Sequence, residues 1–243
     1  MINEKQQLQI TEKEPLVFSL GGSLVVPPSG IDIEFLANFR KFIDEVTSHG
    51  RKVVVVVGGG GTARKYQDAA RQVAPLTRDD LDWLGIHSTR LNGHLLRTVL
   101  REISNPIMFK NPTRIPKEWP EPVIVAAGWK PGWSTDYVAV RAARRLGGRL
   151  VLNLSNVDQL FTTDPKLDPT AAPISSTTWP NFCKMVGTEW DPGMNVPFDP
   201  VASKFARKNH MTVLLMGGKD LDNVEACIKG KSFVGTTIRP DKS

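Results

Sequence analysis

Cysteine is scarce in this chain, and long apolar stretches are missing. Cys183 and Cys227 are the only cysteines in 243 residues, and they stand far apart without a pairing pattern. A disulfide framework and a zinc site are therefore not indicated, and core positions are the expected role of both thiols. No apolar run approaches the roughly 18 residues that a membrane-spanning helix needs. The polar opening segment, 1–14, lacks the apolar centre of a signal peptide, so we expect a cytoplasmic protein without a membrane partner.

The charged residues are not clustered in the sequence. The chain carries 31 Lys and Arg against 25 Asp and Glu, a formal net charge of +6. Because the basic residues are dispersed and no nucleic-acid motif is present, we expect no nucleic-acid partner. Attraction of small phosphorylated substrates is a sufficient account of the positive balance. The four histidines show no ligand spacing, so the sequence leaves any metal site unknown.

One stretch organises the rest: the five valines at 53–57 run directly into four glycines at 58–61. Five β-branched residues without polar alternation are typical of a strand buried on both faces. Glycines at the carboxyl end of a strand let backbone N–H groups approach an anion. Helical spacing over 62–73 predicts that this turn feeds a helix N-terminus, where Arg64 would contact phosphate oxygens. A plain flexible turn is the alternative, and the glycines match neither a P-loop nor a dinucleotide fingerprint.

Strands and helices are expected to alternate along the chain. The pattern predicts strands at 16–20, 53–57, 123–127, 150–154, 212–216 and 235–238, and helices at 32–50, 62–73, 78–101, 135–146, 181–186, 200–208 and 221–229. We expect the tract 105–122 to run over the surface, and 179–197 to form either a lid or a surface loop. The alternation predicts an α/β fold, a three-layer sandwich with a mostly parallel central sheet. Residues 1–14 are expected to be a flexible lead-in to a single domain at 15–243.

Four strand-end loops should lie at one edge of this sheet: 21–23, 58–61, 128–136 and 155–164. Two are glycine clusters suited to phosphates, and the other two offer hydroxyl, amide and carboxylate groups suited to ribose and base. Such a set indicates transfer between two phosphorylated ligands. Phosphoryl transfer asks little covalent chemistry of a protein, because positioning and charge stabilisation do most of it.

In this order the segments resemble the amino acid kinase family, and within it the archaeal-type uridylate (UMP) kinases, over about residues 16–239. The motifs that carry the resemblance are Phe18-Ser19-Leu20-Gly21-Gly22-Ser23, Ala63-Arg64-Lys65-Tyr66, Thr89-Arg90-Leu91-Asn92, Pro131 to Asp136, Ser155 to Asp158, and Asp199 to Lys204. The resemblance implies transfer of the γ-phosphoryl group of ATP to UMP with Mg²⁺, in pyrimidine nucleotide biosynthesis. It also implies an acceptor lobe at about 15–150 and an ATP lobe at about 151–243. With the apolar positions of the long helix, it favours a homo-oligomer, with a hexamer as the form common among similar kinases.

The same resemblance assigns residues to each ligand. ATP is expected at Ser19, Leu20, Gly21, Gly22, Ser23, Gly60 and Arg64 for its phosphates, and at Ser155, Asn156, Phe161 and Asp164 for its nucleoside. UMP is expected at Gly59, Asp82, Trp129, Lys130, Pro131, Gly132, Trp133, Ser134 and Thr135. Lys204 is the candidate for neutralising charge on the transferred group, and Asp136 for orienting the cations around it. A solvated helix lysine and a helix cap are the plain alternatives.

One departure from the family pattern bears on the mechanism. Ser19 stands where many members carry a lysine, which leaves open whether Lys130 or Arg64 supplies the charge between donor and acceptor. The alternative functions are a same-fold kinase for a carboxylate, carbamate or isoprenoid phosphate, and a non-catalytic nucleotide- or oxyanion-binding protein. A dinucleotide oxidoreductase is disfavoured because the carboxylates at 79–82 open a helix instead of ending a strand. The preference among UMP, CMP and dUMP stays open.

Overall fold

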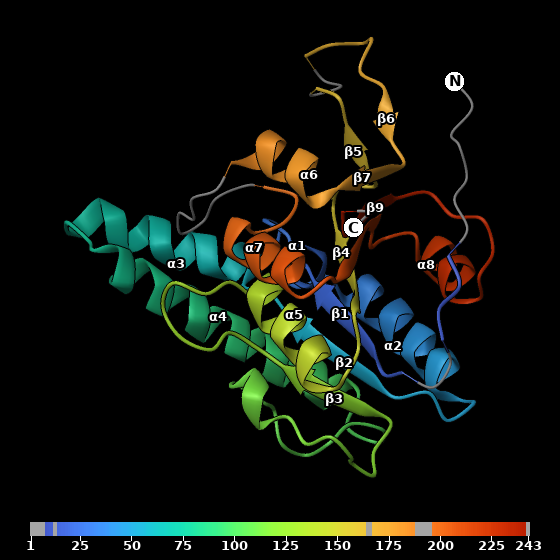
Figure 1. The fold of residues 1–243 in the computed structure, drawn as a ribbon. Coiled ribbons are helices and arrows are strands. Elements are labelled where there is room, and N and C mark those ends of the chain that lie inside the picture. Colours follow the sequence, from blue (N-terminus) through green and yellow to red (C-terminus); the bar gives the residue numbers. More distant parts are fainter. Residues whose placement is uncertain (1–7, 12–13, 164–166, 188–195, 242–243) are drawn as a thin grey trace.

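The computed structural model describes residues 8–11, 14–163, 167–187 and 196–241 (Figure 1). Its centre is a seven-stranded sheet in the order β3-β2-β1-β4-β8-β9-β7. The strands are β1 (Leu16–Leu20), β2 (Val53–Val57), β3 (Val123–Ala126), β4 (Leu150–Ser155), β7 (Ser176–Thr178), β8 (Thr212–Gly217) and β9 (Thr236–Arg239). The first four and β8 run parallel, whereas β9 is antiparallel to β8. The predicted α/β fold with a mostly parallel sheet is confirmed.

Helices cover both faces of the sheet (Figure 1). On one face lie α1 (Gly22–Val25), α2 (Ile33–Thr47), α4 (Arg78–Val99) and α8 (Leu221–Ile228); on the other lie α5 (Thr135–Arg145), α6 (Trp179–Val186), α7 (Pro200–Lys208) and the 3₁₀ turn η1 (Pro112–Arg114). The helix α3 (Gly60–Val73) packs along α4. No helix among the described residues has the length and apolar character to cross a membrane.

Strand β1 shows how the sequence produces three layers. Phe18 and Leu20 belong to the core cluster under α2, while Val17 belongs to the cluster under α5. Side chains alternate between the faces of a strand, so a strand covered on both sides must be apolar throughout. The five valines of β2 divide between the two clusters in the same way.

The order of the strands reverses at β1. From β1 the chain moves outward through β2 and β3, and then returns to place β4 and β8 on the other side. In open sheets of this kind a crevice forms at the carboxyl ends of the strands where the order reverses. The neighbours are joined there by backbone hydrogen bonds, from Gly21 N to Leu154 O at 2.8 Å and from Gly58 N to Leu20 O at 2.9 Å.

The tract 105–122 was expected to run over the surface, and the structure bears this out only in part, because many of its residues are exposed while others are anchored in the core. Met108, Ile115 and Trp119 are buried. Phe109 N donates to Val125 O at 3.0 Å, so this segment lies along the free edge of β3. An edge strand presents unpaired backbone groups, and the tract satisfies some of them.

The proline-rich region after β4 holds more regular structure than its sequence indicates. A short ribbon pairs β5 (Leu160–Phe161) with β6 (Pro173–Ile174), and β7 pairs with the distant β9. Trp179 begins α6 two residues earlier than predicted and is fully buried, its Nε1 donating to Met211 O at 2.8 Å. The predicted lid continues to 197, and its part at 188–195 lies outside the described residues. In the N-terminal segment 1–14, Leu8 and Ile10 pack against the core under α2. Residues 1–7 and 12–13 of this segment lie outside the described residues.

Helix α4 begins with a capping box formed by Thr77 and Asp80. Asp80 N donates to Thr77 Oγ1 at 3.2 Å, and Thr77 N donates to Asp80 Oδ2 at 2.9 Å. Thr77→Ala should therefore lower the free energy of unfolding by about 1 kcal/mol. Urea denaturation should show a lower midpoint with an unchanged slope. Thr77→Ser keeps the hydroxyl and serves as the control; equal midpoints for the serine and alanine variants would contradict the prediction.

Candidate active site

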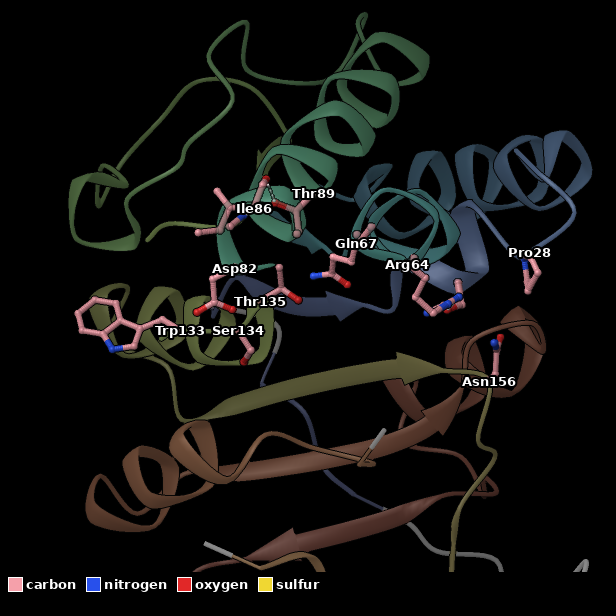
Figure 2. Close-up of a pocket in the computed structure, with 16 residues that line it drawn as sticks. Pro28, Arg64, Gln67, Asp82, Ile86, Thr89, Trp133, Ser134, Thr135 and Asn156 are labelled. Atoms are coloured by element: carbon pink, nitrogen blue, oxygen red, sulfur yellow. Dashed lines mark hydrogen bonds between the residues drawn. The ribbon is translucent and has the colours of Figure 1, made fainter. Parts of the chain in front are cut away.

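A cavity of about 610 Å³ opens at the carboxyl ends of β1 to β4 (Figure 2). All four predicted loops contribute to its wall, through Ser23, Gly59, Gly128 and Asn156. The convergence of these loops on one edge of the sheet is confirmed by the parallel pairing of the four strands. The volume falls in the range of small-molecule sites.

A smaller cavity of about 210 Å³ adjoins the first. Gly21, Ser155 and Val157 line it, together with Ser23 and Asn156, which also line the larger cavity. The two hollows therefore meet at Ser23 and Asn156. This junction lies beside the reversal of strand order between β1 and β4.

Two glycine turns cross at this edge. A Cβ on Gly22 would overlap the backbone of Gly58 and Gly60, and a Cβ on Gly60, which has φ +57°, would overlap Gly22. Only glycine allows the turns after β1 and β2 to pack this closely. Helix α3 begins at Gly60, two residues before its predicted start, so Gly60 and Gly61 belong to its first turn.

Arg64 projects into the larger cavity from the first turns of α3 (Figure 2). Its Nη2 donates to Ser23 Oγ at 3.1 Å, which links α3 to the turn after β1. Among the described residues that line the two cavities, Arg64 is the only cationic side chain. A guanidinium beside the N-terminus of a helix suits the oxygens of a phosphate group.

Lys130 does not line either cavity. Its Nζ lies 4.2 Å from the ring centroid of Trp133 and 5.3 Å from that of Trp129. A cation in this position interacts with the faces of the rings. Of the two cations considered for the position of the missing lysine, the structure therefore brings Arg64 to the cavity and leaves Lys130 on the outside of the loop.

Asp82 meets the loop 128–134 across the cavity (Figure 2). Its Oδ2 accepts a hydrogen bond from Gly132 N at 2.6 Å. Burial raises the pKa of Asp82, and the bond from Gly132 opposes that rise. Trp133 and Ser134 of this loop line the cavity, as does Thr135 at the start of α5, whereas Trp129, Pro131 and Gly132 do not.

Asp136 holds a polar junction beneath the cavities. Its Oδ1 accepts from Ser19 Oγ at 2.7 Å and from Asn153 Nδ2 at 2.9 Å, and its Oδ2 accepts from Asp199 N at 3.2 Å. Ser19 and Asn153 are paired residues of β1 and β4, and Asp199 caps α7. Burial raises the pKa of Asp136 to about 6; the bond from Ser19 opposes this, and the charge of Asp199 adds to it. One carboxylate thus joins two strands and the starts of two helices.

Three other predicted residues, all within the described ranges, lie away from the larger cavity. Lys204 lies on the exposed side of α7, where it lines a separate hollow with Arg207 and Lys208. It faces outward because Ala202, Ser203 and Ala206 fill the buried side of the helix. Leu20 is buried in the core, Phe161 lies in β5 and contributes to neither cavity, and Asp164 lies outside the described residues.

Sequence reasoning missed most of what α4 and α3 contribute. The cavity wall also contains Gln67, Gly85, Ile86 and Thr89. Asn92 Nδ2 donates to the carbonyl oxygens of Gly58 and Gly59, at 2.9 and 3.0 Å. The signal was available, because positions 82, 85–86 and 89 recur at helical spacing and so share one face of α4 with Asp82.

Comparisons with known proteins are consistent with this geometry. The sequence model of the amino acid kinase family matches residues 14–217. The uridylate kinase of Hyperthermus butylicus is 32% identical over 226 residues, covering 91% of this chain and 96% of the relative. The uridylate kinase of Methanospirillum hungatei is 34% identical over 229 residues, covering 92% and 94%.

Solved structures give the same picture. The crystal structure of uridylate kinase from Archaeoglobus fulgidus matches with a TM-score of 0.76 at 28% identity, covering 92% of this chain and 99% of that one. Aspartate kinase from Synechocystis matches with a TM-score of 0.72 at 20% identity, covering 94% of this chain and 40% of that one. The second likeness concerns the fold alone.

The raised pKa of Asp136 gives a testable dependence of stability on pH. An unfolded aspartate titrates near pH 3.9. Because the folded pKa of about 6 is higher, the contribution of this group to stability is fully present below about pH 4 and is lost as the pH rises through about 6. Asp136→Asn cannot ionise, so its free energy of unfolding should improve relative to the natural protein between pH 4 and pH 7.

Urea denaturation at pH 4.5, 6.0 and 7.5 measures this difference. The exposed Asp222→Asn, in the first turn of α8, is the matched control and should show no such trend. A constant difference between Asp136→Asn and the natural protein across the three pH values would show that Asp136 is already ionised at low pH.

Proposed function

The chain belongs to the amino acid kinase family, and from that premise we propose that it transfers the γ-phosphoryl group of ATP to UMP, giving ADP and UDP. The curated relatives that support this are uridylate kinases, and the match to this chain covers more than nine-tenths of their length. The observation that carries the proposal is the meeting of two cavities at Ser23 and Asn156. Two nucleotides that entered from opposite sides would bring their phosphates together there.

The larger cavity suits the acceptor nucleotide. Arg64 lies toward one end of the cavity, and Asp82 and Ile86 lie toward the other (Figure 2), so a nucleoside monophosphate would place its phosphate near Arg64 and its ribose near Asp82. One carboxylate oxygen of Asp82 bonds Gly132 N, and the other is the acceptor we assign to a ribose hydroxyl. The base would then lie against Ile86, Thr89 and Gly128.

ATP would take the other side, with its phosphates over the turn at 21–23 and its nucleoside beside Ser155 and Asn156. A phosphate oxygen of UMP attacks the γ-phosphorus, and the bond from that phosphorus to the bridging oxygen of ADP breaks. The attacking oxygen is already ionised at neutral pH, so the protein needs no general base. Its task is to hold the two phosphates in line and to absorb their charge.

We assign to Arg64 the task of neutralising the negative charge of the two phosphates. It reaches the junction of the cavities through its bond to Ser23. Backbone N–H groups at the start of α3 add their partial charge. Lys204 is not included in this assignment, because it lies on the outer side of α7.

Magnesium fits this site as a companion of ATP. Among the described residues no group of three His, Cys, Asp or Glu could hold a metal ion. Both oxygens of Asp136 already accept hydrogen bonds. Mg²⁺ often binds through substrate phosphates and water with few protein ligands, and there it would neutralise phosphate charge. Asp136 would then support the site by fixing the ends of β1 and β4.

The function is tested by ADP release in a coupled assay with ATP, Mg²⁺ and a panel of acceptors. UMP should give the highest kcat/KM. The panel should include aspartate, carbamate and an isoprenoid phosphate, which other acceptor classes of this fold would use. ATP hydrolysis that no nucleoside monophosphate accelerates would refute the proposal.

Arg64→Met should lower kcat/KM for UMP by about a hundredfold, because it removes the cation at the junction. Arg71→Met is the matched control on the same helix, where Arg71 bonds Asp68 at 2.9 Å, and its activity should stay near that of the natural protein. Lys130→Met should cost less than about threefold. A larger loss for Lys130→Met than for Arg64→Met would contradict this assignment and would give the charge-neutralising role to Lys130.

We also propose a cytoplasmic homo-oligomer that acts in pyrimidine nucleotide biosynthesis. Trp83 is 41% exposed and Leu91 62% exposed on α4. Apolar side chains of this size at the surface of a helix favour contact with another copy. Light scattering at micromolar protein should give a mass that is a multiple of 26.8 kDa. Leu91→Lys should lower that mass, and a monomer mass for the natural protein would contradict the proposal.

A further inference from the structure

Gln67 lines the larger cavity but has no part in the transfer described so far. It lies on α3 one turn after Arg64, so the two side chains share a face of the helix. The residue is only 6% exposed. Glutamine is seldom buried this far, and the polar atoms of buried side chains are nearly always hydrogen-bonded. Both ends of the Gln67 amide therefore need a partner.

The amino end of this amide is satisfied by the protein. Nε2 donates to Leu81 O at 2.8 Å, in the first turn of α4. This contact fixes which end of the amide is which, because a backbone carbonyl oxygen only accepts and the group that faces it must be the NH2. Glycine at position 85 leaves room for the amide, since a Cβ there would lie 3.3 Å from Nε2.

The carbonyl end belongs to the wall of the cavity. Within the described part of the chain, Oε1 accepts no hydrogen bond. Figure 2 shows the amide between Arg64 and Asp82. The bond to Leu81 agrees with this placement, because Leu81 directly precedes Asp82. A free acceptor thus lies between the cation assigned to the phosphate and the carboxylate assigned to the ribose.

The ribose of a nucleoside 5′-monophosphate carries two hydroxyl donors, on its 2′ and 3′ carbons. The 2′ carbon adjoins the ring carbon that bears the base, and the 3′ carbon adjoins the ring carbon that bears the phosphate arm. With the phosphate at Arg64 and the base at Ile86, the 3′ hydroxyl lies on the phosphate side of the sugar. It is therefore the hydroxyl nearer to Gln67, and the 2′ hydroxyl is the one nearer to Asp82.

Resting on the proposed function, we propose that Gln67 is a substrate-binding residue whose Oε1 accepts a hydrogen bond from the 3′ hydroxyl of the acceptor ribose. Its Nε2 meanwhile ties α3 to α4. The sugar is then held by acceptors on two helices, Gln67 on α3 and Asp82 on α4. A substrate without the 3′ hydroxyl leaves a buried acceptor unpaired, and such a penalty discriminates between substrates.

The test compares kcat/KM for UMP with that for 3′-deoxyUMP, by ADP release. The natural protein should prefer UMP by about tenfold, because the analogue leaves Oε1 unpaired. Gln67→Met keeps the length of the side chain but has no carbonyl, so it should lose most of this preference through a lower kcat/KM for UMP. Gln67→Glu keeps an acceptor and should retain the preference, although its negative charge near the phosphate should lower both values.

The chain and the substrate each offer a matched control. Gln72→Met makes the same change on the same helix, at an exposed residue that lines neither cavity, and its activity should equal that of the natural protein. The control substrate is 2′-deoxyUMP. The preference for UMP over 2′-deoxyUMP should be the same in Gln67→Met as in the natural protein, because the 2′ hydroxyl is assigned to Asp82.

Three results would overturn the inference while the proposed function stands. They are equal use of UMP and 3′-deoxyUMP by the natural protein, a change in Gln67→Met confined to 2′-deoxyUMP, and an equal loss with UMP and 3′-deoxyUMP in Gln67→Met. A purely structural role through Leu81 would give the last of these. A natural protein that does not phosphorylate UMP would overturn the proposed function itself. Thermal unfolding checks the folding of each variant, and the comparison in the natural protein holds even if Gln67→Met does not fold.

Discussion

The close crossing of two backbone turns is the constraint on which the site depends. Gly22 follows β1, Gly58 and Gly60 follow β2, and a side chain on Gly22 or Gly60 would overlap the other turn. Their contact places the N-terminus of α3, and with it Arg64, beside Ser23. Glycine is therefore required at these positions because the two backbones pack directly against each other, and the open space beside the turns is a consequence of that packing.

Asp136 extends this constraint into the sheet. It accepts from Ser19 on β1 and from Asn153 on β4, the two strands between which the strand order reverses. It also accepts from the backbone of Asp199, at the start of α7. The partner on β1 is a neutral serine, whose hydroxyl donates to the carboxylate. Burial is the main cause of the raised pKa of Asp136, and the bond from Ser19 opposes it.

Helix α4 joins the two halves of the larger cavity. Asn92 bonds the carbonyls of Gly58 and Gly59, while Thr89 and Arg90 bond the loop after β3. Asp82, two turns earlier, bonds the far end of the same loop at Gly132. Residues on a regular helix hold their relative positions, so one element sets the distance between the glycine turn after β2 and the loop after β3.

Local patterns in the sequence predicted β1 to β4, β8 and β9, most of the helices and the edge at which the loops meet, but not β5, β6 or β7. β-branched runs, capping residues and helical spacing are local, and parallel strands bring their carboxyl ends to one edge. Only the tertiary structure decided that Lys204 faces outward, that Lys130 lies over Trp133, and that the tract after α4 completes the edge of β3. These features depend on contacts between residues far apart in the chain, where packing of a particular face overrides what neighbouring residues can indicate.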